Sequence, residues 1–374
     1  MPDRMSNQAP PIERPLISVV LATYNEVHDI ERCLESILTQ QLTSPEIGPI
    51  NIEVIAVDGM SDDGTISILH QFAARDTRLR VVTNESRRAP FAFNLGLRQA
   101  RGEYVCIFGA HTVYRRDYVV TCLVELLAQG AAACGGRVVT VPANHSLGAR
   151  LSAWVMSHPF GSSRRSFRTQ REGLVDTVNY PLFRRDLVLA TGGYDEKLSR
   201  NQDNDLNQKL RSMGHTLWCT WKTQCQYSPK GTVKGLLRYA FGNGLWNSLT
   251  FWINREAMAV RHFIPLGFVL CLLAFALLAA TAAMVPSHYA LAMALPLALC
   301  LSLHLFIGGL AALQVSIRER SFGALWLPPV FLAFHTAYGY GTLVGFAGQL
   351  CAAFLRKVVP RHGGFTSGKN AALP

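Results

Sequence analysis

Short apolar runs alternate with amphipathic stretches through the first third of the chain. Four runs rich in β-branched residues predict buried strands, and a stretch with helical spacing follows each one. Continuous apolar strands separated by helices are typical of a parallel sheet covered on both faces, so we expect an α/β fold with the carboxyl ends of its strands along one edge. The predicted strands are Leu16–Thr23, Ile52–Asp58, Leu79–Thr83 and Tyr104–Phe108, and the predicted helices begin near His28, Thr65, Pro90 and Asp117.

The pattern changes in the last third of the chain, where long uncharged stretches replace the alternation. Residues 263–284 and 289–313 contain no Asp, Glu, Lys or Arg, and each stretch exceeds the ~20 residues that span a bilayer. A third uncharged stretch, 325–355, is broken by two adjacent prolines. One tilted helix over 328–352 and a re-entrant hairpin are both compatible with it. The sequence therefore predicts a membrane region over 263–355.

Residues 233–262, which precede this region, mix large apolar and basic side chains. Such a mixture suits a helix at a membrane interface, although a helix of a globular core has the same composition. We expect a disordered tail at 1–15, an α/β domain at 16–232, an interfacial segment, the membrane region and a basic tail at 356–374.

Composition and charge restrict the class of protein. Apolar residues make up 49% of the 374 residues and charged residues 16%, which excludes a disordered chain. The net charge of +11 suits an anionic lipid surface or a phosphorylated substrate. We expect no nucleic-acid partner, because no reader motif accompanies the charge. The nine cysteines form no CxxC pair, so reduced thiols in a protein that faces the cytoplasm are expected.

Polar residues gather where the first two predicted strands end. Thr23, Tyr24 and Glu26 follow the first strand, and Asp58 ends the second. Ligands of open α/β sheets bind at this edge. A carboxylate here can accept hydrogen bonds from a base or a ribose, whereas the aspartates that follow Asp58 are also ordinary helix caps.

Basic side chains follow the next two predicted strands. Arg88 comes after the third strand, where a guanidinium group can meet a diphosphate. A solvated arginine explains the same residue equally well. His111 follows the fourth strand, at a position that is useful for a metal or phosphate ligand. A structural histidine is the alternative there.

The last polar cluster lies at residues 200–211. Asp203, Leu206 and Leu210 share one face of a predicted helix, which places Asp203 on the side that packs inward and Asp205 well around the helix. A partly desolvated carboxyl group has a raised pKa and is a better base. An N-cap role for Asp203 is the alternative.

Taken in order, these segments resemble the family 2 glycosyltransferases, which have a GT-A fold. The pieces that carry the resemblance are Ser18–Glu26, Val57–Thr65, Asn94–Gly96, Ala100–Val105 and Gly192–Glu196. Two further stretches resemble the succinoglycan-type polysaccharide glycosyltransferases, which also carry C-terminal membrane spans: Asp176–Arg185 and Arg200–Asp203.

The resemblance implies that residues 16–232 form a GT-A nucleotide-sugar-binding domain, followed by transmembrane helices. It implies an inverting transfer of a sugar from a nucleotide donor, most of all a UDP-linked one, in exopolysaccharide biosynthesis. A nucleotide-sugar site joined to apolar spans and a basic flank leads us to expect a lipid-linked acceptor, on the cytoplasmic side of the inner (plasma) membrane. Asp203 matches the family's general base. Nucleotide-sugar binding falls to Thr23, Tyr24, Glu26, Asp58 and Arg88, and the acceptor side to Gln202, Asp195 and Glu196.

One departure from the family pattern concerns the divalent cation. The family's metal motif usually has an aspartate where this chain has Gly109, which leaves His111 as the remaining candidate ligand for Mg²⁺ or Mn²⁺. The same departure supports a second hypothesis, a non-catalytic subunit that binds a nucleotide sugar within a polysaccharide-synthesis assembly. No QxxRW sequence lies near residues 242–248, so transfer of a single sugar is favoured over processive synthesis.

Overall fold

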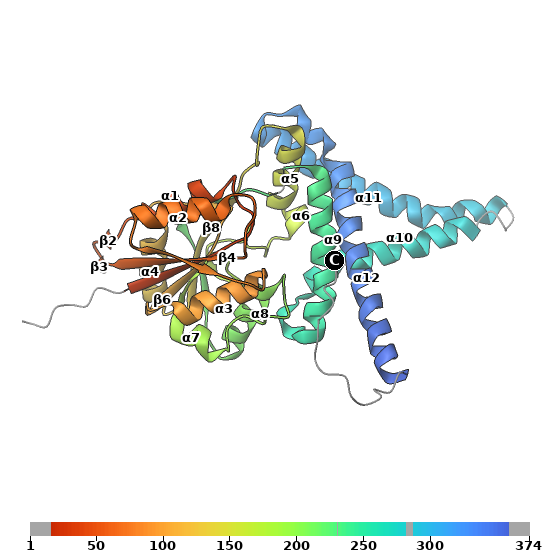
Figure 1. Ribbon diagram of the computed structural model, residues 1–374. Coiled ribbons are helices and arrows are strands. Elements are labelled where there is room, and N and C mark those ends of the chain that lie inside the picture. Colours follow the sequence, from red (N-terminus) through yellow and green to blue (C-terminus); the bar gives the residue numbers. More distant parts are fainter. Residues whose placement is uncertain (1–15, 230, 282–286, 359–374) are drawn as a thin grey trace, which may run out of the picture.

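The computed structural model describes residues 16–229, 231–281 and 287–358, and shows a sheet domain joined to a group of long helices (Figure 1). The tail expected at 1–15 and most of the tail expected at 356–374 lie outside the described residues.

A mixed sheet of nine strands forms the centre of the N-terminal domain. Its strands are β1 (Leu16–Thr23), β4 (Asn51–Asp58), β5 (Leu79–Thr83), β6 (Tyr104–Gly109), β7 (Thr112–Tyr114), β8 (Ala133–Thr140), β9 (Gly173–Leu174), β10 (Leu182–Arg184) and β11 (Leu217–Tyr227). The strand order is β5-β4-β1-β6-β10-β8-β11-β7, with β9 paired to β11. The first four in this order are mutually parallel, as predicted, whereas β10 runs antiparallel to both of its neighbours. A separate hairpin pairs β2 (Thr43–Ser44) with β3 (Gly48–Pro49).

Helices cover both faces of the sheet (Figure 1). One face packs on α1 (Ile30–Leu38), α2 (Thr65–Arg75) and α4 (Tyr118–Gln129), and the other on α3 (Ala89–Gln99), α7 (Arg185–Ala190) and α8 (Gln202–Ser212). The alternation along β1 explains the two layers, because Val19 and Leu21 bury on the first face and Val20 on the second. The strands predicted from the sequence are confirmed to within one residue at each end, and the helix starts to within two.

The second part of the molecule consists mainly of helices. After α5 (Leu147–Ser157) and α6 (Pro159–Ser162), the chain returns to the sheet and then forms α9 (Val233–Ile253), η1 (Arg255–Ala257), η2 (Val260–His262), α10 (Ile264–Thr281), α11 (Ser287–Glu319), η4 (Phe322–Trp326) and α12 (Leu327–Val358). α9 lies between the sheet domain and α12, and the two helices run side by side (Figure 1). Their backbones approach closely, since a Cβ on Gly244 would lie 2.0 Å from the carbonyl oxygen of Tyr338. Most of the segment predicted as interfacial, 233–262, is thus the helix α9, which packs along α12.

α10 and α11 project away from the sheet domain (Figure 1). Within the described residues, two helical segments are long and apolar enough to cross a bilayer, Ile264–Thr281 and Tyr289–Glu319. Only 6% of the most apolar window of each is buried in the molecule, so their side chains face outward as those of a membrane-anchored protein do. The third predicted span falls on α12, which is one continuous helix without the break of a re-entrant hairpin. Over the described residues, α12 is not one of the two helices that are apolar enough to cross a bilayer.

Candidate active site

β1 and β4 end side by side at the carboxyl edge of the sheet. Thr23 and Asp58 are register partners, and the Thr23 hydroxyl donates a 3.0 Å hydrogen bond to Asp58 Oδ1. Asp58 also accepts from the backbone N–H of Ser61 at 2.9 Å and from its hydroxyl at 2.6 Å. Tyr24 follows Thr23 and is 43% exposed, with its ring beside the backbone of Gly59. Asp58 therefore fixes the turn after β4, while Tyr24 presents an open aromatic face.

The other polar residues of these two turns bind one another. Asn25 and Asp62 exchange two hydrogen bonds of 2.9 and 3.0 Å. Asp63 accepts from the Thr65 hydroxyl at 2.6 Å and from the backbone N–H of Val27 at 3.0 Å. The hydrogen bond from Thr65 lowers the pKa of the Asp63 carboxyl group. Asp62 therefore stabilises the turn and Asp63 the start of α2, although the N-cap residue itself is Gly64, which has no side-chain cap.

His111 and Glu26 face each other across the ends of β6 and β1. His111 Nδ1 lies 3.4 Å from Glu26 Oε1, and the two side chains are 39% and 27% exposed. The His111 ring also packs edge-on against Tyr227, with ring centroids 5.5 Å apart. The sequence placed both residues at this edge of the sheet but did not predict that they pair.

The surroundings of Gly109 do not fit a divalent cation held by carboxylates. Gly109 ends β6 without a ligand atom in a side chain, and a Cβ there would lie 3.0 Å from the Tyr180 ring. A side chain at this position would therefore crowd the Tyr180 ring, which would have to shift by a few tenths of an ångström. Over the described ranges, no group of three His, Cys, Asp or Glu side chains is placed to hold a metal. We therefore assign no chemical step to a metal ion.

Asp203 lies in the first turn of α8. Asn201, the N-cap residue, has a left-handed backbone with a φ of 60°, a conformation that asparagine tolerates better than most residues. The Asn201 side chain donates to Asn247 at 3.0 Å and to Thr250 at 3.2 Å, which fixes the start of α8 against α9. In the described part of the chain, no residue donates a hydrogen bond to the Asp203 carboxylate or forms an ion pair with it. Burial raises the pKa of Asp203 to about 6.

The prediction that Asp203 is the inward carboxylate and Asp205 the outer one was wrong for Asp205. Asp205 is only 1% exposed, forms a 2.7 Å ion pair with Lys209 and accepts a 2.7 Å hydrogen bond from Asn254. The end of α9 covers the face of α8 that the pattern treated as open. Asp203 is half-buried and keeps its oxygens free of such partners. It is therefore the carboxylate of this helix that a substrate can reach.

The residues predicted for the acceptor side lie in the loop before α8 and at its first position. Gln202 Oε1 is buried, and no described residue donates a hydrogen bond to it. Glu196 Oε1 accepts a 3.1 Å hydrogen bond from Asn94, and Asp195 accepts one of 2.8 Å from the backbone N–H two residues on. Gln202 is thus an unsatisfied acceptor beside Asp203, whereas Asp195 and Glu196 stabilise the loop.

Arg88 binds this same loop. Its Nε donates to the Ser199 hydroxyl at 2.9 Å, and its Nη2 donates to the Lys197 carbonyl at 3.2 Å. Nearby, Asn94 Oδ1 accepts from the backbone N–H of Tyr194 at 2.9 Å. Two pieces of the sequence resemblance therefore meet in space, although about a hundred residues separate them. A direct contact between Arg88 and a nucleotide stays a prediction.

Residues that the sequence analysis did not assign to the site form a cationic and aromatic cluster between β11 and α9. Arg168 Nη2 donates a 3.2 Å hydrogen bond to the Tyr239 hydroxyl, and its guanidinium group lies 5.0 Å from the centroid of the Tyr227 ring. Arg200 lies 5.3 Å from the centroid of the Tyr239 ring and donates to Asn243 at 2.6 Å. No periodicity marks Arg168, which lies in an irregular segment with three other arginines between residues 164 and 171.

Comparisons with known proteins agree with the predicted family. Residues 18–190 match the family described as Glycosyl transferase family 2. The chain is 29% identical over 252 residues to the succinoglycan biosynthesis protein ExoA of Rhizobium meliloti, which covers 67% of this chain and 74% of that protein. It is 25% identical over 266 residues to the dolichyl N-acetyl-alpha-D-glucosaminyl phosphate 3-beta-D-2,3-diacetamido-2,3-dideoxy-beta-D-glucuronosyltransferase of Methanococcus voltae, covering 69% of this chain and 80% of that one.

A solved structure confirms the fold. The mannosyltransferase PcManGT from Pyrobaculum calidifontis, in complex with GDP-Man and Mn²⁺, matches with a TM-score of 0.54 at 20% identity. The match covers 92% of this chain and 90% of that chain. The predicted class, a GT-A-like sheet domain followed by long apolar helices, is therefore confirmed.

Proposed function

Because the chain belongs to the glycosyltransferases of family 2, we propose that it transfers one sugar from a nucleotide donor to a lipid-linked acceptor, with inversion at the anomeric carbon. The similarity to a succinoglycan biosynthesis protein supports a polysaccharide as the product class. A UDP-linked donor remains our prediction from the sequence.

Asp203 is the single observation that carries this proposal. Its carboxylate has no protein partner among the described residues, and its pKa of about 6 makes it mostly ionised at neutral pH yet more basic than an ordinary aspartate. In the proposed step it takes the proton from an acceptor hydroxyl while that oxygen bonds to the anomeric carbon. The bond from this carbon to the donor diphosphate breaks with its electron pair, and the nucleoside diphosphate leaves. Gln202 Oε1 can accept a hydrogen bond from a second acceptor hydroxyl.

We place the nucleotide at the adjoining ends of β1 and β4. The exposed Tyr24 ring offers a face on which a base can stack. Thr23 and Asp58 hold the turn beside it through their 3.0 Å hydrogen bond. Glu26 lies two residues after Tyr24 and is partly exposed, so its carboxylate can accept a hydrogen bond from a ribose hydroxyl when it is not paired with His111.

We further propose that α10 and α11 anchor the protein in the inner membrane, with the catalytic domain at 16–232 on the cytoplasmic side. The outward-facing apolar surface of the two helices supports this placement. The packed α9 then joins the catalytic domain to the membrane region, close to the place where a lipid-linked acceptor would enter.

Sugar transfer by the purified full chain in detergent tests the proposal. The protein receives a lipid extract and a radiolabelled pool of nucleotide sugars, and label in the lipid fraction is counted. We expect transfer by the wild type and by Asp186→Asn, a matched control whose side chain is 63% exposed on α7. Asp203→Asn should lose it. Full activity of Asp203→Asn would show that another group is the base.

The environment of Gly109 favours a second candidate function, a subunit that binds a nucleotide sugar without turnover. It predicts donor binding by calorimetry and no transfer with any lipid extract. Transfer by the wild type in the assay above excludes this candidate.

A further inference from the structure

Arg168 and Arg200 are two guanidinium groups gathered around one tyrosine, and neither has an acidic partner in the described structure. Arg168 Nε is buried and has no hydrogen-bond acceptor among the described residues. Aromatic rings surround the Arg168 guanidinium group instead, with the centroid of Phe167 at 4.0 Å and that of Tyr227 at 5.0 Å.

Positive charge held away from water without an anion is unfavourable. Cation–π contacts with the rings offset part of this cost, but they leave the Nε hydrogen of Arg168 unused. Burial by itself would raise the pKa of Tyr239, yet the charge of Arg168, a hydrogen bond with Asn243 and, more weakly, the charge of Arg200 hold it below its ordinary value. The cluster is therefore a site of strong positive potential with donors still free.

The cluster lies between two parts of the candidate active site. Tyr227, beneath Arg168, packs against His111. Arg200 precedes Asp203 by three residues, immediately before the N-cap of α8. Arg200 lies against α9, since a Cβ on Gly242 would be in van der Waals contact with its guanidinium group at 3.4 Å. A ligand bound at the cluster would thus be close to both the sheet edge and the proposed base.

We infer that Arg168 and Arg200 form a binding site for a phosphate or diphosphate group of a substrate, with the Tyr239 hydroxyl as a further donor. The guanidinium group presents a fork of N–H donors that matches phosphate oxygens. The diphosphate of the donor and the phosphate of a lipid-linked acceptor share this chemistry. The inference rests on the proposed function, because it concerns the charged groups of that same reaction. If the donor diphosphate is the ligand, the two arginines supply positive charge to it. A metal ion would supply that charge otherwise, and the residues around Gly109 do not fit one.

Calorimetry on the full chain in detergent tests the inference with three probes: inorganic pyrophosphate, UDP and a polyprenyl phosphate. We expect Arg168→Met and Arg200→Met to weaken binding about 10- to 100-fold, the loss typical of a hydrogen bond to a charged group. Arg255→Gln is the matched control, since its guanidinium group also lies over a ring, 4.8 Å from the centroid of Phe251, but is exposed. It should bind all probes as the wild type does.

The pattern of loss identifies the source of the phosphate. Weaker binding of pyrophosphate and UDP assigns the site to the donor, and weaker binding of the polyprenyl phosphate alone assigns it to the acceptor. Unchanged affinity of Arg168→Met for all three probes overturns the inference. If that variant does not fold, Arg200→Met and Tyr239→Phe carry the test, and unchanged affinity in both overturns it. Pyrophosphate binding needs no turnover, so a chain that binds it through Arg168 but transfers no sugar supports the inference while contradicting the proposed function.

Discussion

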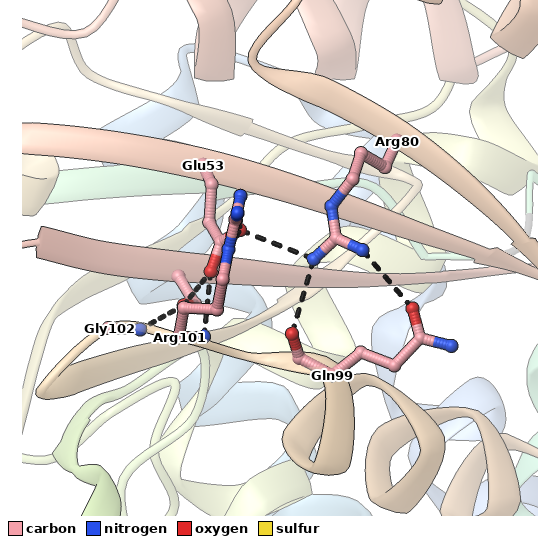
Figure 2. Close-up of polar contacts among 6 residues, drawn as sticks. Glu53, Arg80, Gln99, Arg101 and Gly102 are labelled. Atoms are coloured by element: carbon pink, nitrogen blue, oxygen red, sulfur yellow. Dashed lines mark hydrogen bonds and ion pairs between the residues drawn. The ribbon is translucent and has the colours of Figure 1, made fainter.

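Two carboxyl groups of the sheet domain, Glu53 on β4 and Asp203 on α8, have opposite surroundings. Toward the amino end of β4, the buried Glu53 accepts hydrogen bonds from the Ser18 hydroxyl at 2.7 Å, from Arg101 at 2.8 Å and from Arg80 at 3.2 Å (Figure 2). Near the carboxyl edge, Asp203 has no such partner among the described residues. The first arrangement surrounds the carboxylate with donors and stabilises the fold, whereas the second leaves a charged group free to meet a substrate.

The pKa values of the two carboxyl groups express this difference. Burial alone would raise the pKa of Glu53, but hydrogen bonds from Ser18 and Arg101 hold it below its ordinary value of 4.5. Asp203 has burial without compensation, and its pKa rises to about 6. The pKa of one kind of group therefore shifts in opposite directions because Glu53 has hydrogen-bond donors around it and Asp203 has none among the described residues.

Removing the charge of Asp203 should produce the largest effect. The asparagine in Asp203→Asn has the same shape but cannot take the proton from the hydroxyl of the acceptor substrate. We therefore expect the rate of sugar transfer to fall about 10²- to 10⁴-fold. Initial rates of sugar transfer measure the loss, with Asp186→Asn as the control. A loss of similar size in the control would show that the assay responds to surface charge and not to a base.

Breaking the hydrogen-bond network of Glu53 should lower the stability of the fold and leave the rate of sugar transfer unchanged. Glu53→Gln leaves Arg80 and Arg101 without their common partner, so we expect unfolding to become easier by about 2–3 kcal/mol. Transfer per folded molecule should stay unchanged. Denaturant unfolding compares this variant with Glu103→Gln, which alters an exposed side chain. Equal stability of the two variants would contradict the role given to the network.

Stability should depend on pH in opposite ways at the two sites. Glu53 has a lowered pKa in the folded state, so its contribution is present above about pH 4.5 and is lost as pH falls through the lowered pKa. Asp203 has a raised pKa, so the folded state is penalised as pH rises from 3.8 toward 6. Asp203→Asn should therefore be more stable than the wild type at pH 7, on the order of 2 kcal/mol. A melting temperature below that of the wild type would contradict this.

Removing divalent cations should have the smallest effect. Because the Tyr180 ring occupies the space beside Gly109, we expect EDTA to leave wild-type transfer unchanged. Gly109→Asp requires the ring to move by a few tenths of an ångström, and we expect it to lower transfer slightly without creating metal dependence. A double variant with Tyr180→Ala opens the space and should respond to added Mn²⁺. Loss of wild-type transfer in EDTA would place a metal at the site after all.

The sequence predicted the first half of the sheet well, whereas β7 to β11 were not predicted, although β8 and β11 are eight and eleven residues long. Apolar runs identified β1, β4, β5 and β6, because buried parallel strands are apolar along their whole length. β10 was not predicted, since three residues carry too little pattern to reveal a strand, and its antiparallel direction depends on distant neighbours. Asp203 was singled out by its helical spacing and its motif, and its role as the base stays a prediction.

The cationic cluster could not be predicted in the same way. The hydrogen bond from Arg168 to Tyr239 joins residues 71 positions apart, and the segment around Arg168 has no periodicity. The buried state of Asp205 was also missed, because the pattern of α8 alone does not show that the end of α9 covers its other face. Local spacing predicts elements and their inner faces, whereas partners supplied by distant segments depend on the assembled fold.

The pH dependence of transfer tests the central claim most directly. With saturating donor and limiting acceptor, the rate of the wild type should rise about tenfold per pH unit below the pKa of Asp203, bend near pH 6 and then level off. Glu53→Gln should keep this profile, and Asp203→Asn should lose the bend. A wild-type rate that is flat from about pH 5 to pH 8, or a bend that persists in Asp203→Asn, would contradict the account.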